Sequence, residues 1–233
     1  MAQHLDLEEQ EQIEQLKHFW NTWGTLITAV LVLVFGALAA WNGYQYWQNR
    51  QATQAAALFD ALDVAASVGD VPKMAQAFAD LRASYASTVQ AAQAGLLLAK
   101  AQVDKGQLDA AKDTLAWVAS DGGDKAYQAL AHLRLAGVLM EQKALDEALK
   151  QVSGSFPAQF AALVADRKGD ILMLMDKRKE AAAAYTDAYK AFDAESPYRR
   201  LVEIKLQALG EAPEAKAANA ASVPSPATKE ERS

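Results

Sequence analysis

A charge-free apolar stretch near the N-terminus, residues 24–41, is the most hydrophobic part of the chain. Charge is absent from the whole of residues 18–49, between Lys17 and Arg50. An α-helix rises about 1.5 Å per residue, so roughly 20 apolar residues cross the hydrocarbon layer of a bilayer. The pattern predicts one transmembrane helix over residues 24–47. Aromatic residues flank both of its ends, as in the interfacial belts of membrane proteins: Trp20, Trp23, Trp41, Tyr44, Tyr46 and Trp47.

Two other interpretations account for part of this pattern. A helix buried in a soluble protein can be apolar on all sides, but a run of this length is typical of a membrane span. Residues 37–39 also match the A-x-A pattern of a signal-peptide cleavage site. Signal peptides begin with a positively charged leader, whereas residues 1–17 contain five acidic residues and one lysine. We therefore expect an uncleaved membrane anchor.

The remainder of the chain has the apolar spacing of helices. Segments of about a dozen residues are separated by short breaks that contain Gly, Pro, Ser or Asp. No segment alternates apolar and polar residues for long enough to indicate a strand. The pattern predicts an all-α domain. The breaks lie at residues 69–72, 105–106, 120–123, 153–154 and 196–197.

A repeat runs through these helical segments. Its key position is a small residue, Ala111, Ala148 or Ala181, and these three lie 37 and 33 positions apart. Another small residue precedes each of them by twelve positions, and a large apolar residue follows each by four positions. A degenerate fourth copy places Ala65 before Ala77. The preceding small residues are Ala99, Ala136 and Gly169, and the following large ones are Leu115, Val152 and Tyr185.

This arrangement resembles the tetratricopeptide repeat, a helix–turn–helix unit of about 34 residues. Small residues on both helices allow close packing, and at least about three units must stack to bury their apolar faces. The signature Trp and the Leu-Gly pair of the first helix are largely missing here. The spacing of 37 residues implies a longer loop, which we place at residues 120–125. We predict a tetratricopeptide-like helical-repeat solenoid.

The C-terminal part contains one further helix and a polar tail. Ser196 and Pro197 form a favourable helix start, and the helix from Tyr198 to Leu209 ends at Gly210. No apolar segment follows this helix, so we expect it to cap the solenoid. We predict four parts: an acidic N-terminal segment (1–23), the transmembrane helix (24–47), the repeat domain (48–210) and a disordered tail (211–233).

Composition narrows the function further. The 233 residues carry a formal net charge of −6, which provides no basic surface for nucleic acid. There is no cysteine, which suits an oxidising compartment. The three histidines lack metal-ligand spacing, and the sequence has no nucleotide-binding or hydrolase motif. We therefore expect no enzyme activity, cofactor, metal or small-molecule substrate. Charge leaves the orientation of the anchor open, because Lys17 and Arg50 nearly balance.

Three stretches resemble the YfgM family of bacterial inner-membrane proteins: residues 7–24, 41–62 and 106–118. The resemblance covers about residues 5–210. It implies an ancillary subunit of the Sec translocon, with a cytoplasmic N-terminus and a periplasmic repeat domain. It also implies as partners the SecYEG channel, a membrane-anchored periplasmic chaperone of the PpiD type and emerging secreted client proteins.

The expected mechanism is binding rather than chemistry. A helix anchored in the lipid bilayer raises the local concentration of the repeat domain beside the channel, so weak contacts suffice. Stacked repeats present a curved surface to partners. We predict protein contacts at three positions on first helices, namely Gln102, His132 and Arg134. The alternative is a membrane-tethered helical-repeat scaffold for another cell-envelope assembly, because repeat folds serve many functions.

Overall fold

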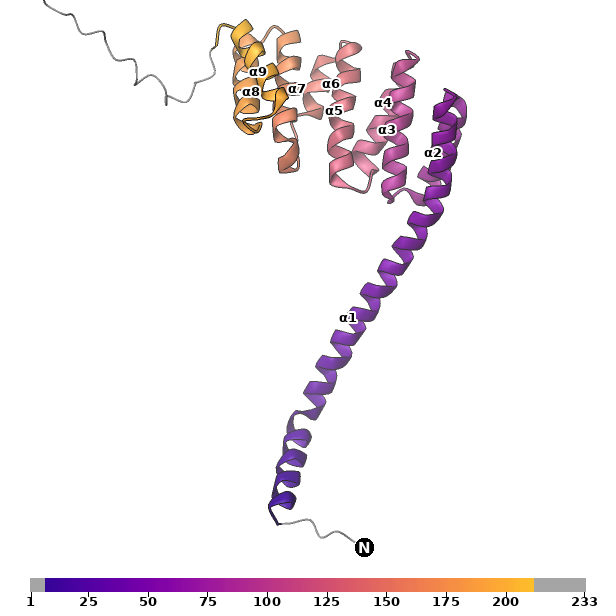
Figure 1. Ribbon diagram of the computed structural model, residues 1–233, viewed down its shortest axis with the longest axis vertical. Coiled ribbons are helices and arrows are strands. Elements are labelled where there is room, and N and C mark those ends of the chain that lie inside the picture. Colours follow the sequence, from indigo (N-terminus) through magenta and orange to yellow (C-terminus); the bar gives the residue numbers. More distant parts are fainter. Residues whose placement is uncertain (1–6, 212–233) are drawn as a thin grey trace, which may run out of the picture. The chain divides into compact units, whose positions relative to one another are not determined.

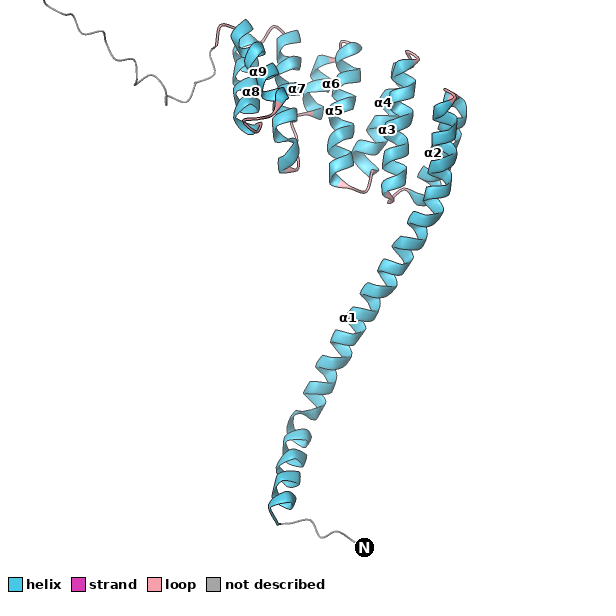
Figure 2. Ribbon diagram, viewed as in Figure 1, coloured by secondary structure: helices cyan, strands magenta, loops and turns pink. Residues whose placement is uncertain are grey.

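The computed structural model describes residues 7–211, and every regular element in that range is helical (Figure 2). The predicted all-α fold is therefore confirmed. The chain forms two compact units, which divide between Gln54 and Ala55. The predicted disordered tail, apart from Glu211, lies outside the described residues. The predicted boundaries between the four parts of the chain stay predictions.

The described residues of the first unit belong to one long helix, whose last turns are part of the second unit. Helix α1 covers Leu7–Ser67, and among the described residues it alone is long and apolar enough to cross a membrane. Its apolar side chains lie on the surface, with Leu33 73% exposed. Two polar side chains bond to the helix backbone itself: Thr22 Oγ1 donates to the His18 carbonyl at 2.8 Å, and Asn42 Nδ2 donates to the Leu38 carbonyl at 3.0 Å. Asn42 lies within the predicted span, where internal pairing of this kind lowers the cost of a polar group in lipid.

The second unit is a series of helical hairpins (Figure 1). The last turns of α1 contribute Ala55, Leu62 and Ala65 to its core. Eight α-helices follow within the described residues: α2 (Val71–Tyr85), α3 (Val89–Asp104), α4 (Leu108–Asp121), α5 (Lys125–Glu141), α6 (Leu145–Gln151), α7 (Ala161–Leu174), α8 (Arg178–Ala191) and α9 (Pro197–Ala208). A 3₁₀-helix, η1 (Ala158–Phe160), precedes α7.

Each hairpin turns through one residue with a positive φ angle. The residue after it donates its backbone N–H to the carbonyl oxygen five positions earlier, at 2.8–2.9 Å, which closes the first helix. The helix α9 ends in the same way, because Gly210 has a φ of 81° and Glu211 N–H donates to the Leu206 carbonyl. Helix α9 is therefore a first helix without a second one among the described residues, as expected of a cap. The four hairpin residues are Gly69 (71°), Gly106 (71°), Lys143 (61°) and Asp176 (58°).

These turns fix the register of the repeat. The three predicted small pairs are all buried, which confirms three of the repeats. The predicted register of the degenerate copy is wrong by three residues. In the later hairpins the key small residue lies five positions after the turn residue with positive φ, and the same offset from Gly69 leads to Met74. The residue twelve positions before Met74, on α1, is Leu62. Both are fully buried, whereas Ala77 is only half-buried. The first hairpin has large apolar residues where the later ones have Ala or Gly, so the small residues Ala65 and Ala77 indicate the wrong register.

The predicted long loop at residues 120–125 is also wrong. Only three residues connect α4 to α5, and the extra length lies in the helices, since α5 has 17 residues and α7 has 14. The hairpin of α5 and α6 differs in the opposite way, because its second helix is short and a long connection follows it. Helix α6 has seven residues, and the chain from Val152 to Phe160 then leads into α7.

Candidate protein-binding groove

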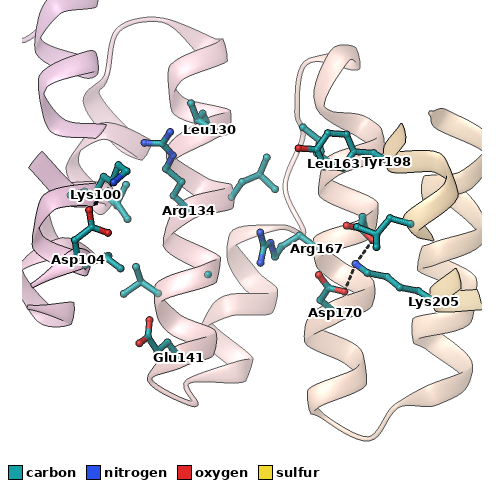
Figure 3. Close-up of a pocket in the computed structure, with 18 residues that line it drawn as sticks. Lys100, Asp104, Leu130, Arg134, Glu141, Leu163, Arg167, Asp170, Tyr198 and Lys205 are labelled. Atoms are coloured by element: carbon teal, nitrogen blue, oxygen red, sulfur yellow. Dashed lines mark hydrogen bonds and ion pairs between the residues drawn. The ribbon is translucent and has the colours of Figure 1, made fainter. Parts of the chain in front are cut away.

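The first helices of successive hairpins line one groove of about 740 Å³. Figure 3 shows the side chains of α3, α5, α7 and α9 that border it. This placement follows from the stack, because equivalent helices of successive repeats lie on the same face. The groove is therefore a property of several repeats together.

Part of the groove is apolar and open to solvent. Tyr198 is 59% exposed and Leu201 is 46% exposed, both on α9. Leu163 on α7 is partly exposed beside them, and Leu130 and Leu133 on α5 continue the apolar lining. Exposed apolar side chains that gather in a groove are typical of interaction sites.

An ion-pair network closes the α9 end of the groove. Lys205 Nζ on α9 lies 2.7 Å from an oxygen of Asp166 and 2.7 Å from an oxygen of Asp170, both on α7. The Tyr185 hydroxyl on α8 donates to the same Asp170 oxygen at 2.8 Å. Burial raises the pKa of Asp166 although Lys205 bonds to it, and burial beside Asp170 raises the pKa of Tyr185. The network joins α7, α8 and α9, and it neutralises the charge of Lys205.

Gly169 on α7 makes this network possible. A Cβ atom at Gly169 would overlap the ring of Tyr185, which lies against the α7 backbone. Because residue 169 has no side chain, the ring reaches across α7 and its hydroxyl meets Asp170. The small residue predicted from the repeat thus positions a polar contact as well as allowing helices to approach.

Two guanidinium groups in the groove have no carboxylate within ion-pair distance in the described part of the chain. Arg134 Nη1 on α5 donates to the Leu96 carbonyl on α3 at 3.2 Å, and burial lowers the pKa of Arg134. Arg167 Nη1 on α7 lies 3.9 Å from the Met140 sulfur, against α5. By contrast, Lys100 on α3 pairs with Asp104 at 2.7 Å. Arg134 and Arg167 are therefore the available cations of the groove (Figure 3).

The structure places the three predicted contact residues in different surroundings. Gln102 is only 6% exposed, and its Oε1 accepts a hydrogen bond from Thr114 Oγ1 at 3.0 Å. His132 Nδ1 lies 2.9 Å from Gln151 Oε1, with its ring edge-on to Phe156. Arg134 alone of the three lines the groove. A role in protein binding stays a prediction for all three.

The sequence prediction missed Arg167, although the repeat contains a signal for it. Arg134 lies two positions before the small residue Ala136, and Arg167 lies two positions before its equivalent, Gly169. Both arginines thus occupy the same repeat position. Among the described residues no three His, Asp or Glu side chains are grouped closely enough to hold a metal ion.

Comparisons with known proteins agree with this architecture. A family model described as a tetratricopeptide repeat-like domain matches residues 17–211. A protein of Neisseria gonorrhoeae is 35% identical over 90% of this chain and 100% of its own length. The chain belongs to the YfgM family. Another relative, from Escherichia coli, is 29% identical over 77% of this chain and 85% of its own. Both relatives are named ancillary SecYEG translocon subunit. An ancillary translocon subunit with a tetratricopeptide repeat-like domain is a non-enzymatic kind of protein.

Proposed function

We propose that this YfgM-family chain is an ancillary subunit of the SecYEG translocon in the bacterial inner membrane. The similarity to the Neisseria protein supports the proposal most strongly, because it extends over that relative's entire length. Helix α1 would provide the anchor, since it has the length and composition of a membrane span. We further propose that the N-terminus is cytoplasmic and the repeat domain periplasmic, a compartment that suits a chain without cysteine.

The repeat domain would act by binding proteins. Its groove offers exposed apolar side chains beside two arginines that have no carboxylate of the described residues within ion-pair distance, which suits a protein segment better than a small metabolite. We propose that its occupants are a periplasmic chaperone of the PpiD type, emerging secreted chains, or both. Anchoring beside the channel would raise the effective concentration of the domain, so that modest affinity is enough.

Co-purification from membranes in a mild detergent tests the translocon assignment. The full chain should recover SecYEG, and deleting residues 24–41, which removes the anchor, should reduce recovery several-fold. A matched control replaces Asp187, an exposed residue on α8, with Asn and should recover the channel normally. Recovery of a different envelope assembly by the full chain, without SecYEG, would contradict the proposal and favour a general scaffold.

A further inference from the structure

A Leu–Arg pair recurs in the groove at equivalent positions of two successive repeats. Leu130 and Arg134 lie one turn apart on α5, and Leu163 and Arg167 lie one turn apart on α7. Both pairs line the groove (Figure 3). Equivalent positions of stacked first helices repeat along the same face of a solenoid. The groove therefore presents an apolar and a cationic group twice in the same order.

The two arginines differ from the lysines of the groove in having no carboxylate within ion-pair distance among the described residues. Lys100 is paired with Asp104, and Lys205 with Asp166 and Asp170. Arg134 and Arg167 bond only a carbonyl oxygen and a sulfur atom among the described residues. Burial lowers the pKa of Arg134, although the residue as a whole is exposed. Arg167 is half-buried and is attracted by Asp166, which lies beyond ion-pair distance. Neither charge is therefore neutralised by a direct ion pair in the described part of the chain.

The backbone of α5 leaves room for a ligand group beside Arg167. Gly137 lies one turn from Arg134 on the same face of α5, and only Arg167 Nη1, at 4.0 Å, comes near the position of a Cβ there. Guanidinium groups bind carboxylates with paired hydrogen bonds, so a carboxylate is the complementary group at this place.

We propose that the groove binds an acidic-apolar segment of a partner protein. Its carboxylate side chains pair with Arg134 and Arg167, and its large apolar side chains cover Leu163, Tyr198 and Leu201. The inference rests on the proposed function in so far as the groove must bind protein. A segment with separate carboxylates fits better than a uniformly anionic surface, because the groove also contains Glu141, which has no cationic partner among the described residues.

Titration of the full chain in detergent with short fluorescent peptides tests this inference. One peptide alternates Asp or Glu with Leu or Phe, and its matched control carries Asn or Gln in place of the acids. The acidic peptide should bind more tightly. Arg134→Gln and Arg167→Gln should each weaken its binding by about tenfold, as expected for the loss of a charge-assisted hydrogen bond. Lys190→Gln removes the same charge from an exposed position on α8 outside the groove and should change binding by less than about twofold.

Each alternative outcome has a distinct meaning. Equal binding of the acidic and neutral peptides, or unchanged binding by both arginine variants, would overturn the inference and leave groove binding intact. Binding of neither peptide would overturn both the inference and the role of the groove. Binding of a short-chain phosphatidylglycerol that requires both arginines, without peptide binding, would assign the arginines to lipid and also overturn the inference. SecYEG recovery is measured for the same variants, and its loss in all of them, Lys190→Gln included, would indicate damage to the fold.

Discussion

Gly169 shows how one missing side chain supports an interhelical contact. The ring of Tyr185 occupies the space that a Cβ atom at residue 169 would need, and the hydroxyl of Tyr185 then reaches Asp170. Gly in a helix interior normally costs about 1 kcal/mol relative to Ala. The residue is retained here because the packing of Tyr185 outweighs that cost.

Gly169→Ala should therefore destabilise the domain. Overpacking typically costs about 1–3 kcal/mol, which exceeds the gain in helix propensity. Gly137→Ala is the matched control, because it is also a helical glycine but a Cβ there contacts only the flexible end of Arg167. The control should be neutral or more stable by up to about 1 kcal/mol. Urea unfolding of both full-length variants measures the difference, and a Gly169→Ala variant as stable as Gly137→Ala would contradict this packing.

The surroundings of some single residues could be predicted from the sequence, and those of others could not. Ala111, Ala148 and Ala181 were predictable because a small side chain at a fixed interval has one simple packing reason. Arg167 was not singled out, because its orientation toward α5 depends on how far α7 lies from α5. Gln102 was predicted as a contact residue, yet its pairing with Thr114 depends on the rotation of α3. Helical spacing places a residue on a helix but does not fix which neighbour it meets.

At the scale of elements, α9 packs against α8 and is joined to α7 by ion pairs. Val202 and Leu206 on α9 are buried in the C-terminal core cluster, and Lys205 between them bonds Asp166 and Asp170. The two acidic residues are not equivalent. Asp170 also accepts the Tyr185 hydroxyl, whereas the pKa of Asp166 is raised by burial.

Asp170→Asn should therefore destabilise the domain more than Asp166→Asn at neutral pH. Loss of the Asp170 carboxylate weakens two bonds, a change of about 1–3 kcal/mol. Asp166 binds its proton more tightly in the folded than in the unfolded state, so its contribution to stability falls as pH rises from about 4 through its raised pKa. The stability of Asp166→Asn relative to wild type should therefore increase across that range. Urea unfolding at several pH values measures both effects, and the reverse order of the two variants would contradict the described network.

Two of the hairpin turns could not be recognised from the residue type at the turn. Gly69 and Gly106 are recognisable as hairpin residues, but Lys143 and Asp176 adopt the same left-handed conformation without being glycine. The register of the first hairpin was missed because Met74 replaces a small residue. The length of α6 was also not predictable, since Val152 continues the repeat pattern although the helix has ended at Gln151.

For the whole molecule, the sequence already contained the essential organisation: an apolar anchor followed by stacked helix pairs. That organisation was predictable because hydrophobic length and a repeat of about 34 residues are properties of the chain itself. A curved surface on the first helices was also predictable, but the side chains that line the groove were not, because they come from α3, α5, α7 and α9, which are far apart in sequence. The central claim is that this groove faces the periplasm and binds proteins of the secretion machinery.

Photocrosslinking in living cells tests that claim most directly. A photoreactive residue in place of Leu163, in the groove, is compared with one in place of Asp187, which is exposed on α8 outside it. The account predicts adducts at position 163 with SecYEG, a PpiD-type chaperone or secreted chains, and none of these at position 187. Adducts with cytoplasmic proteins at position 163, or the same adducts at both positions, would contradict it.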